Sequence, residues 1–210
     1  MFIEFQLLIR RNQSNIMGID NKIIERRRDN LNRAVSFHGH LCLGQVLGVH
    51  LAERGMEVIR TTDPNEIIVY VENDRCIADA IQIITGTRLG RRSMKLVNYG
   101  KMAATFINTR TGDAYRVWVS GKVNEMIGEI SSDLQEREMQ YKTVLESCSD
   151  DIVNVQRVSV DIPGWEMPGK PQRIVICKRC KEKVMDGKDV LHDDGPLCMA
   201  CAGNPYYRLL

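Results

Sequence analysis

Four cysteines near the C-terminus have the types and the spacing of a metal site. Cys177 and Cys180 form one C-x-x-C pair, and Cys198 and Cys201 form a second pair after seventeen intervening residues. Two such pairs are typical of structural zinc, which four thiolates bind as a tetrahedron. Four unliganded cysteines and an iron site are the alternatives. A module of about 40 residues buries too little apolar surface to fold alone, so we expect zinc to stabilise it.

A second set of potential ligands lies in the segment His38-Gly-His40-Leu-Cys42. In an extended segment, side chains at alternate positions point the same way, so His38, His40 and Cys42 can reach one ion. Zinc accepts both imidazole and thiolate ligands. The alternative is that His38 caps the preceding helix and Cys42 is a small buried apolar residue.

Cys76 opens a predicted helix, where the positive end of the helix dipole favours a thiolate. Asp79 follows three residues later and therefore lies on the same helix face. We predict that Cys76 joins His38, His40 and Cys42 in a core site for a second metal ion, which we expect to be zinc. For any chemistry at this site, Cys42, Cys76 and Asp79 are the candidate catalytic residues.

The elements that must position these residues follow from hydrophobic periodicity and turn residues. Apolar residues at helical spacing predict helices over 20–38, 43–55, 75–85 and 132–148. Gly55 is expected to end the second of them. Segments rich in β-formers and bounded by turn residues predict strands over 67–71, 102–108, 114–120 and 155–160. Regular βαβ alternation is missing, so we expect an α+β fold with a mostly antiparallel sheet.

Composition changes along the chain predict three parts. We interpret residues 1–19 as an N-terminal extension that lacks fixed structure, with Met17 as the better start. Residues 20–165 form the predicted α+β core domain. Glycines and prolines mark a connector at the start of 166–210, and the predicted finger follows it.

Overall composition sets few limits on function. The 210 residues carry 29 basic and 27 acidic side chains, a balance unlike the strong positive excess of many nucleic-acid-binding proteins. We expect neither a signal peptide nor a membrane span, because both sequence patterns are missing. The seven cysteines are odd in number, which disfavours a disulfide framework. We therefore expect a cytoplasmic protein whose paired cysteines are metal ligands.

At the core-site residues the chain resembles the family of formylmethanofuran dehydrogenase E subunits. The resemblance rests on Phe37, His38, Gly39, His40, Leu41, Cys42, Gly44, Cys76, Asp79, Ala80, Ile81, Gln82, Thr85, Gly86, Gly90, Tyr99, Gly100 and Lys101. It implies an α+β core, often dimeric, with a metal-associated pocket at His38, His40, Cys42 and Cys76. It also implies a C-terminal treble-clef zinc finger over 170–210.

The sequence departs from the family pattern at two places. Leu43 stands where the family usually has proline, and Thr87 with Arg88 stands where it usually has cysteine followed by threonine. A redox role for a thiol at position 87 is therefore not expected here.

The resemblance implies a metal-binding protein that is accessory to one-carbon metabolism and methanogenesis. As part of a formylmethanofuran dehydrogenase, an oxidoreductase, it would leave the main chemistry to other subunits, which are candidate partners beside a second copy of this chain. A core metal would polarise a carbonyl group or lower the pKa of bound water, with Asp79 or a histidine moving protons.

The alternative function is a regulator that binds nucleic acid or protein through the finger, with the core as sensor or dimerisation domain. Basic residues of this segment support it, namely Lys170, Arg173, Lys178, Arg179, Lys181 and Lys183. Nearby acidic residues dilute the positive field, which favours the accessory role.

Overall fold

The computed structural model describes residues 20–208 and 210. The predicted extension at 1–19, including Met17, lies outside the described residues. The chain divides into two compact units, one that ends at Val160 and one that begins at Asp161. Within the described part, no helix is both long and apolar enough to cross a membrane.

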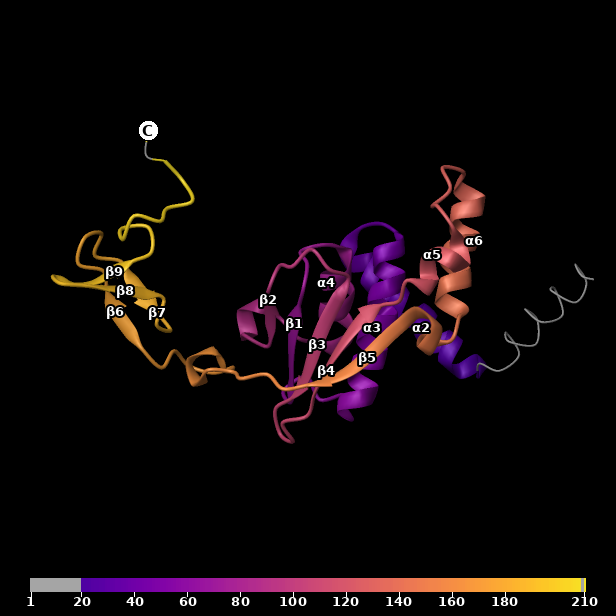
Figure 1. The fold of residues 1–210 in the computed structure, drawn as a ribbon, viewed down its shortest axis with the longest axis horizontal. Coiled ribbons are helices and arrows are strands. Elements are labelled where there is room, and N and C mark those ends of the chain that lie inside the picture. The colour runs from indigo at the N-terminus through magenta and orange to yellow at the C-terminus, as the bar shows by residue number, and fades with distance from the viewer. Residues whose placement is uncertain (1–19, 209) are drawn as a thin grey trace, which may run out of the picture. The chain divides into compact units, whose positions relative to one another are not determined.

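A five-stranded sheet forms the centre of the first unit (Figure 1). Its strands are β1 (Ile67–Val71), β2 (Met94–Leu96), β3 (Ala103–Asn108), β4 (Ala114–Val119) and β5 (Val153–Val158), in the spatial order β2-β1-β3-β4-β5. Only the β1–β2 pair among these is parallel. The predicted α+β fold with a mostly antiparallel sheet is therefore confirmed.

Helices pack on the sheet and at one end of it. They are α2 (Asn21–His38), α3 (Leu43–Ile59), α4 (Cys76–Thr85), α5 (Lys122–Ile127), α6 (Leu134–Glu146) and α7 (Ser149–Ile152), with short 3-10 turns at η1 (Leu89–Arg91) and η2 (Gly164–Glu166). Figure 1 shows α3 and α4 behind the strands, with α5 and α6 close together to the right of the sheet. Val69 of β1 and its cross-strand partner Phe106 of β3 are fully buried in the core that these helices cover.

The central helix α3 continues past Gly55 to Ile59, so the prediction that Gly55 ends it was wrong. Gly55 has a packing role instead. A Cβ atom at this position would lie 2.4 Å from ring carbons of the buried Phe106. The helix ends at Arg60, which adopts a left-handed backbone conformation with a φ of 55°.

A buried polar network joins α2, α3 and the end of α6. Arg27 is 4% exposed. Its guanidinium donates to the backbone carbonyls of Leu145 and Ser147 and lies 3.5 Å from the Glu53 carboxylate. His50 is fully buried, and its Nε2 lies 2.9 Å from the Val144 carbonyl oxygen. Burial and the Arg27 charge lower the pKa of His50 to about 3, so this ring is neutral.

The second unit contains two antiparallel hairpins. One pairs β6 (Ile174–Ile176) with β7 (Lys183–Met185), and the other pairs β8 (Asp189–His192) with β9 (Gly195–Cys198). Four cysteines lie within or next to these hairpins, so the unit is compatible with a zinc finger.

Candidate metal sites

The turn between α2 and α3 brings three potential ligands together. His38 is the last residue of α2, and Gly39 ends that helix with a φ of 95°, a backbone conformation that favours glycine. Cys42 precedes α3 in extended conformation. One ligand atom each from His38, His40 and Cys42 lie within 4.8 Å of one another. This separation is compatible with ligands of a single ion at bond lengths of about 2.0 to 2.3 Å.

Cys76, at the start of α4, lies beside Cys42 because Gly44 permits a close approach of the two helices. A Cβ atom at Gly44 would lie 2.7 Å from the Cys76 Cβ and 3.7 Å from the Cys42 sulfur. Burial raises the pKa of the Cys42 thiol, and its contact with the Cys76 thiol raises it further. A bound cation would oppose both effects, because it stabilises thiolate.

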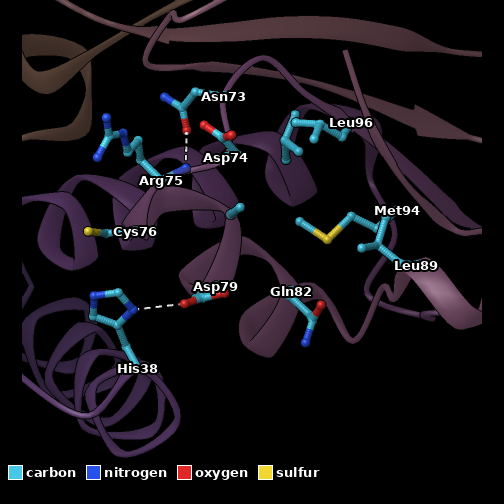
Figure 2. Close-up of a pocket in the computed structure, with 12 residues that line it drawn as sticks. His38, Asn73, Asp74, Arg75, Cys76, Asp79, Gln82, Leu89, Met94 and Leu96 are labelled. Carbon is cyan, nitrogen blue, oxygen red and sulfur yellow. Dashed lines mark hydrogen bonds and ion pairs between the residues drawn. The ribbon is translucent and has the colours of Figure 1, made fainter. Parts of the chain in front are cut away.

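Asp79 orients the His38 ring, as Figure 2 shows. The distance between His38 Nδ1 and Asp79 Oδ2 is 2.7 Å. His38 Nε2 is buried and has no hydrogen-bond partner in the described part of the chain. A carboxylate that accepts from Nδ1 leaves the Nε2 lone pair available, which is the usual second-sphere arrangement for a metal-binding histidine. The residues present therefore fit a metal ion.

Gln45 supports this site, and the sequence analysis did not identify it. Its side chain is fully buried, and its amide nitrogen donates to the Cys76 carbonyl at 2.6 Å. Gln45 thus connects the first turn of α3 to the start of α4. A glutamine on an otherwise apolar helix face was the available signal, because a buried amide needs a partner.

His50, the third histidine of this region, does not join the site. Its two ring nitrogens contact the Val144 carbonyl and, at 3.3 Å, the Ser149 hydroxyl. It is a structural residue of the core.

A cavity of about 420 Å³ opens beside the core site. Its polar end includes His38, Cys76 and Asp79, and its other end is apolar (Figure 2). The full lining comprises His38, Val71, Asn73, Asp74, Arg75, Cys76, Ala78, Asp79, Gln82, Leu89, Met94 and Leu96. A small molecule in this cavity would therefore lie next to the potential metal ligands.

In the second unit, Cys177, Cys180, Cys198 and Cys201 also have ligand atoms within 4.8 Å of one another. The Cys177 sulfur accepts from the Cys198 backbone N–H at 3.3 Å, and this and other backbone hydrogen bonds lower the pKa of Cys177 to about 6. The neighbouring Cys198 thiol raises the pKa of Cys201 to about 12. Four thiolates this close repel one another, so a bound cation is needed for all four to ionise.

A model of one protein family matches most of the first unit. The family is described as "FmdE, Molybdenum formylmethanofuran dehydrogenase operon", and the match covers residues 37–159, more than half of the chain. The chain belongs to the FmdE family. The matched FmdE segment contains His38, His40, Cys42, Cys76 and Asp79 and ends before the finger cysteines.

Two individual proteins are similar to this FmdE-family chain. The "Probable S-adenosyl-L-methionine-binding protein" of Archaeoglobus fulgidus is 26% identical over 204 residues, which cover 84% of this chain and 53% of that relative. The chain thus spans about half the length of this curated relative.

The second is an FmdE-like protein from Syntrophus aciditrophicus, known from a crystal structure and named after the tungsten formylmethanofuran dehydrogenase. It matches with a TM-score of 0.60 and 20% identity, over 92% of this chain and 98% of that one. At this level of identity, the likeness shows the fold that the FmdE-family chains share.

Proposed function

We propose that this FmdE-family protein binds a catalytic-type metal ion, zinc, at His38, His40, Cys42 and Cys76, and a structural zinc ion at the four finger cysteines. The main support for the core site is the hydrogen bonding of the two His38 ring nitrogens. Its Nδ1 is held by Asp79, while its buried Nε2 lacks a partner in the described structure and lies in a cluster of three potential ligands. An orphaned buried nitrogen costs free energy, which a metal bond would offset.

The roles of the individual residues follow from these contacts. Asp79 holds the proton on His38 Nδ1 and so fixes the ring orientation. Gln45 fixes the start of α4, and with it Cys76, through the Cys76 carbonyl. A bound zinc ion would supply Lewis acidity to a small molecule in the adjoining cavity. Cys42, Cys76 and Asp79 remain the residues that we propose to act in any such chemistry.

Family membership supports an accessory role in one-carbon metabolism, including methanogenesis. In that role the protein would assist a formylmethanofuran dehydrogenase, with oxidoreductase chemistry on other subunits. The four-cysteine unit would serve stability or assembly, because its potential metal ligands leave no open position.

Metal analysis of the full-length protein tests the core site. We expect about two zinc ions per chain, one for each ligand cluster. Cys42→Ser should lower this value to about one while the finger keeps its ion. The matched control is Cys148→Ser, because Cys148 is an exposed thiol outside both clusters. Unchanged zinc content in Cys42→Ser, or a wild-type protein that binds one ion even with zinc added, would reject the core site.

The Archaeoglobus relative adds one ligand to test in the adjoining cavity. Its name describes S-adenosyl-L-methionine binding, and the aligned part covers 84% of this chain. We propose S-adenosyl-L-methionine as a candidate ligand of the same cavity. Isothermal titration calorimetry with this compound tests the idea, and the absence of heat at millimolar ligand would remove it.

A homodimer is a further part of the proposal, supported by the family resemblance and by exposed apolar residues of α6. Met139 is 68% exposed and Leu134 is 62% exposed. Val144 of the same helix is fully buried and offers nothing to a partner. Light scattering should give twice the chain mass of 23.9 kDa at tens of micromolar protein. A monomer mass at that concentration would contradict the dimer.

The alternative function, nucleic-acid binding through the finger, has weaker support, because contacts within the finger engage some of its basic residues. Three of its basic residues are engaged within their own unit. Arg173 pairs with Asp189, Arg179 donates to the Cys201 carbonyl, and Lys181 donates to the Lys178 carbonyl. Salt-dependent binding to mixed-sequence DNA would favour the alternative, whereas no binding at low salt would remove it.

A further inference from the structure

The cavity beside the core site has an apolar wall that is partly open to solvent. Leu89 is 62% exposed and Leu96 is 48% exposed, while Met94, which also lines the cavity, is buried. Met94 and Leu96 are alternate residues of β2, paired with Val69 and Val71, so both point toward the helix-covered side of the sheet. A ligand with an apolar body would cover this wall and gain its burial free energy.

Two opposite charges lie on consecutive residues at the same cavity. Asp74 and Arg75 both line it, and both side chains are exposed. Over residues 20–208, the Asp74 carboxylate and the Arg75 guanidinium have neither a hydrogen bond nor an ion pair. The other carboxylate of the lining, Asp79, already accepts from His38. The cavity therefore offers one free anion and one free cation to a ligand.

The start of α4 adds to the cationic side. Arg75 is the N-cap residue of this ten-residue helix, and its side chain makes no capping hydrogen bond. The positive end of the helix dipole and the guanidinium both favour a carboxylate. The Asp74 carboxylate favours an ammonium group next to it. Figure 2 shows Asp74 between Arg75 and the apolar side chain of Leu96.

We propose that the cavity binds a free α-amino acid with an apolar side chain. Its carboxylate pairs with Arg75, its ammonium group pairs with Asp74, and its side chain packs on Leu89, Met94 and Leu96. An α-amino acid carries one carboxylate and one ammonium group, which are complementary in charge to Arg75 and Asp74 of the lining. This inference deepens the proposed function, since it names a ligand class for the cavity beside the metal ligands. The three contacts themselves do not involve the metal.

Calorimetric titration of the full-length, zinc-replete protein with L-norleucine tests this class. The comparison ligands each lack one feature: hexanoate lacks the ammonium group, hexylamine lacks the carboxylate, and L-serine lacks the apolar chain. We expect L-norleucine to bind at least about tenfold more tightly than each, because a tenfold ratio corresponds to the loss of one modest contact. Equal or weaker binding of L-norleucine would overturn the proposal.

Two variants test which charged group of the ligand each cavity residue contacts. Asp74→Asn should abolish the preference for L-norleucine over hexanoate, and Arg75→Gln should abolish the preference over hexylamine. The matched controls are Asp29→Asn and Arg137→Gln, which change the same residue types on α2 and α6, outside the cavity. Both preferences should persist in the controls. If Asp74→Asn and Arg75→Gln keep both preferences, the proposed orientation is wrong.

Zinc content measured on the same samples separates this inference from the proposed function. Failure of L-norleucine to bind protein that holds its core zinc would reject the amino-acid ligand and leave the metal site intact. Binding that persists in Cys42→Ser protein without the core ion would support the ligand class independently of the metal.

Discussion

The histidines at positions 38 and 50 differ in what their ring nitrogens contact, and this difference decides their chemistry. His38 uses Nδ1 for Asp79 and has Nε2 free of any partner in the described structure. His50 uses Nε2 for the Val144 carbonyl and has Ser149 near Nδ1. The hydrogen bonding of His38 is therefore compatible with a metal bond at Nε2, whereas that of His50 suits a neutral ring in the core.

Replacement of Asp79 tests the orientation of His38. Asp79→Asn removes the negative charge that holds the Nδ1 proton. We expect zinc affinity at the core site to fall by about 10- to 100-fold, the usual cost of losing such a partner. Competition titration with a chromophoric chelator measures this affinity, and Asp29→Asn on the exposed side of α2 is the control. Equal affinity in Asp79→Asn and the control would show that Asp79 has no orienting role.

The lowered pKa of His50 predicts a pH dependence of stability. The folded ring stays neutral down to a pKa of about 3, whereas the unfolded ring takes up a proton near its ordinary value of 6.5. Stability from the neutral ring is therefore complete above pH 6.5. The free energy of unfolding should fall by up to about 1.4 kcal/mol per pH unit as the pH decreases from 6.5 toward 3.

His50→Gln checks this contribution because glutamine can still donate to the Val144 carbonyl and does not titrate. Urea unfolding followed by the fluorescence of Trp118, in a Trp165→Phe background, reports on the core unit. The difference in unfolding free energy between the two proteins should narrow as the pH falls below 6.5. Parallel pH curves would assign the acid sensitivity to other groups.

For individual residues, the sequence indicated which side chains could bind a metal ion but not their hydrogen-bond partners. His38, His40 and Cys42 are close along the chain, so their convergence could be predicted from alternation alone. The partner of His38 is 41 residues away, and the partner of His50 is 94 residues away. Such contacts depend on tertiary packing, which periodicity does not specify.

At the scale of elements, close helix packing shapes the core site. Gly44 lets Cys76 approach Cys42, and at Gly48 a Cβ atom would lie 2.5 Å from the Ala80 Cβ. These two glycines bring α3 against α4, the helix that carries Cys76 and Asp79. Larger residues would separate the two helices and with them the two halves of the candidate site.

Gly55→Ala tests how tightly α3 packs on the sheet. The new methyl group would overlap the ring of Phe106, which is fully buried on β3. We expect an overpacking cost of about 3 kcal/mol, which exceeds the gain of about 1 kcal/mol from the better helix propensity of alanine. Chemical unfolding measures the difference. Gly90→Ala is the control, because no atom lies within 4 Å of a Cβ atom there. A stabilised Gly55→Ala protein would contradict this packing.

The helices and strands differ in how well the sequence predicted them, and Gly55 is one reason. Helices and strands with clear periodicity, such as α2 and the β3–β4 hairpin, were predicted within a few residues. The end of α3 was wrong because glycine was taken as a stop signal, whereas here it makes room for Phe106. Strand β2 was missed because its three residues lack a pattern, and its pairing with β1 depends on the tertiary fold.

At the scale of the whole molecule, the two units differ in what stabilises them. The first unit contains a large apolar core of fully buried residues, including Leu51, Ile59 and Phe106. In the second unit, Cys177 and Leu197 are the buried residues among those described. Apolar burial therefore stabilises the first unit, while the second needs another source of stability.

Metal removal should consequently unfold one unit and leave the other folded. A strong chelator would remove the zinc ion that we propose at the four finger cysteines, and the remaining burial of Cys177 and Leu197 is too small to offset the chain entropy of residues 161–210. Two-dimensional amide NMR measures this residue by residue. We expect the resonances of β6 to β9 to collapse to random-coil positions, while those of β1 to β5 remain dispersed.

Within the first unit, shifts after metal removal should be confined to the surroundings of His38, His40, Cys42 and Cys76. Cys198→Ser is the genetic counterpart, since it should unfold the finger without chelator and keep the core zinc. Finger resonances that stay dispersed after elemental analysis has shown the loss of zinc would contradict a metal-dependent fold. Collapse of β1 to β5 on chelation would instead mean that the core ion is needed for the stability of the first unit, beyond the role proposed for it beside the cavity.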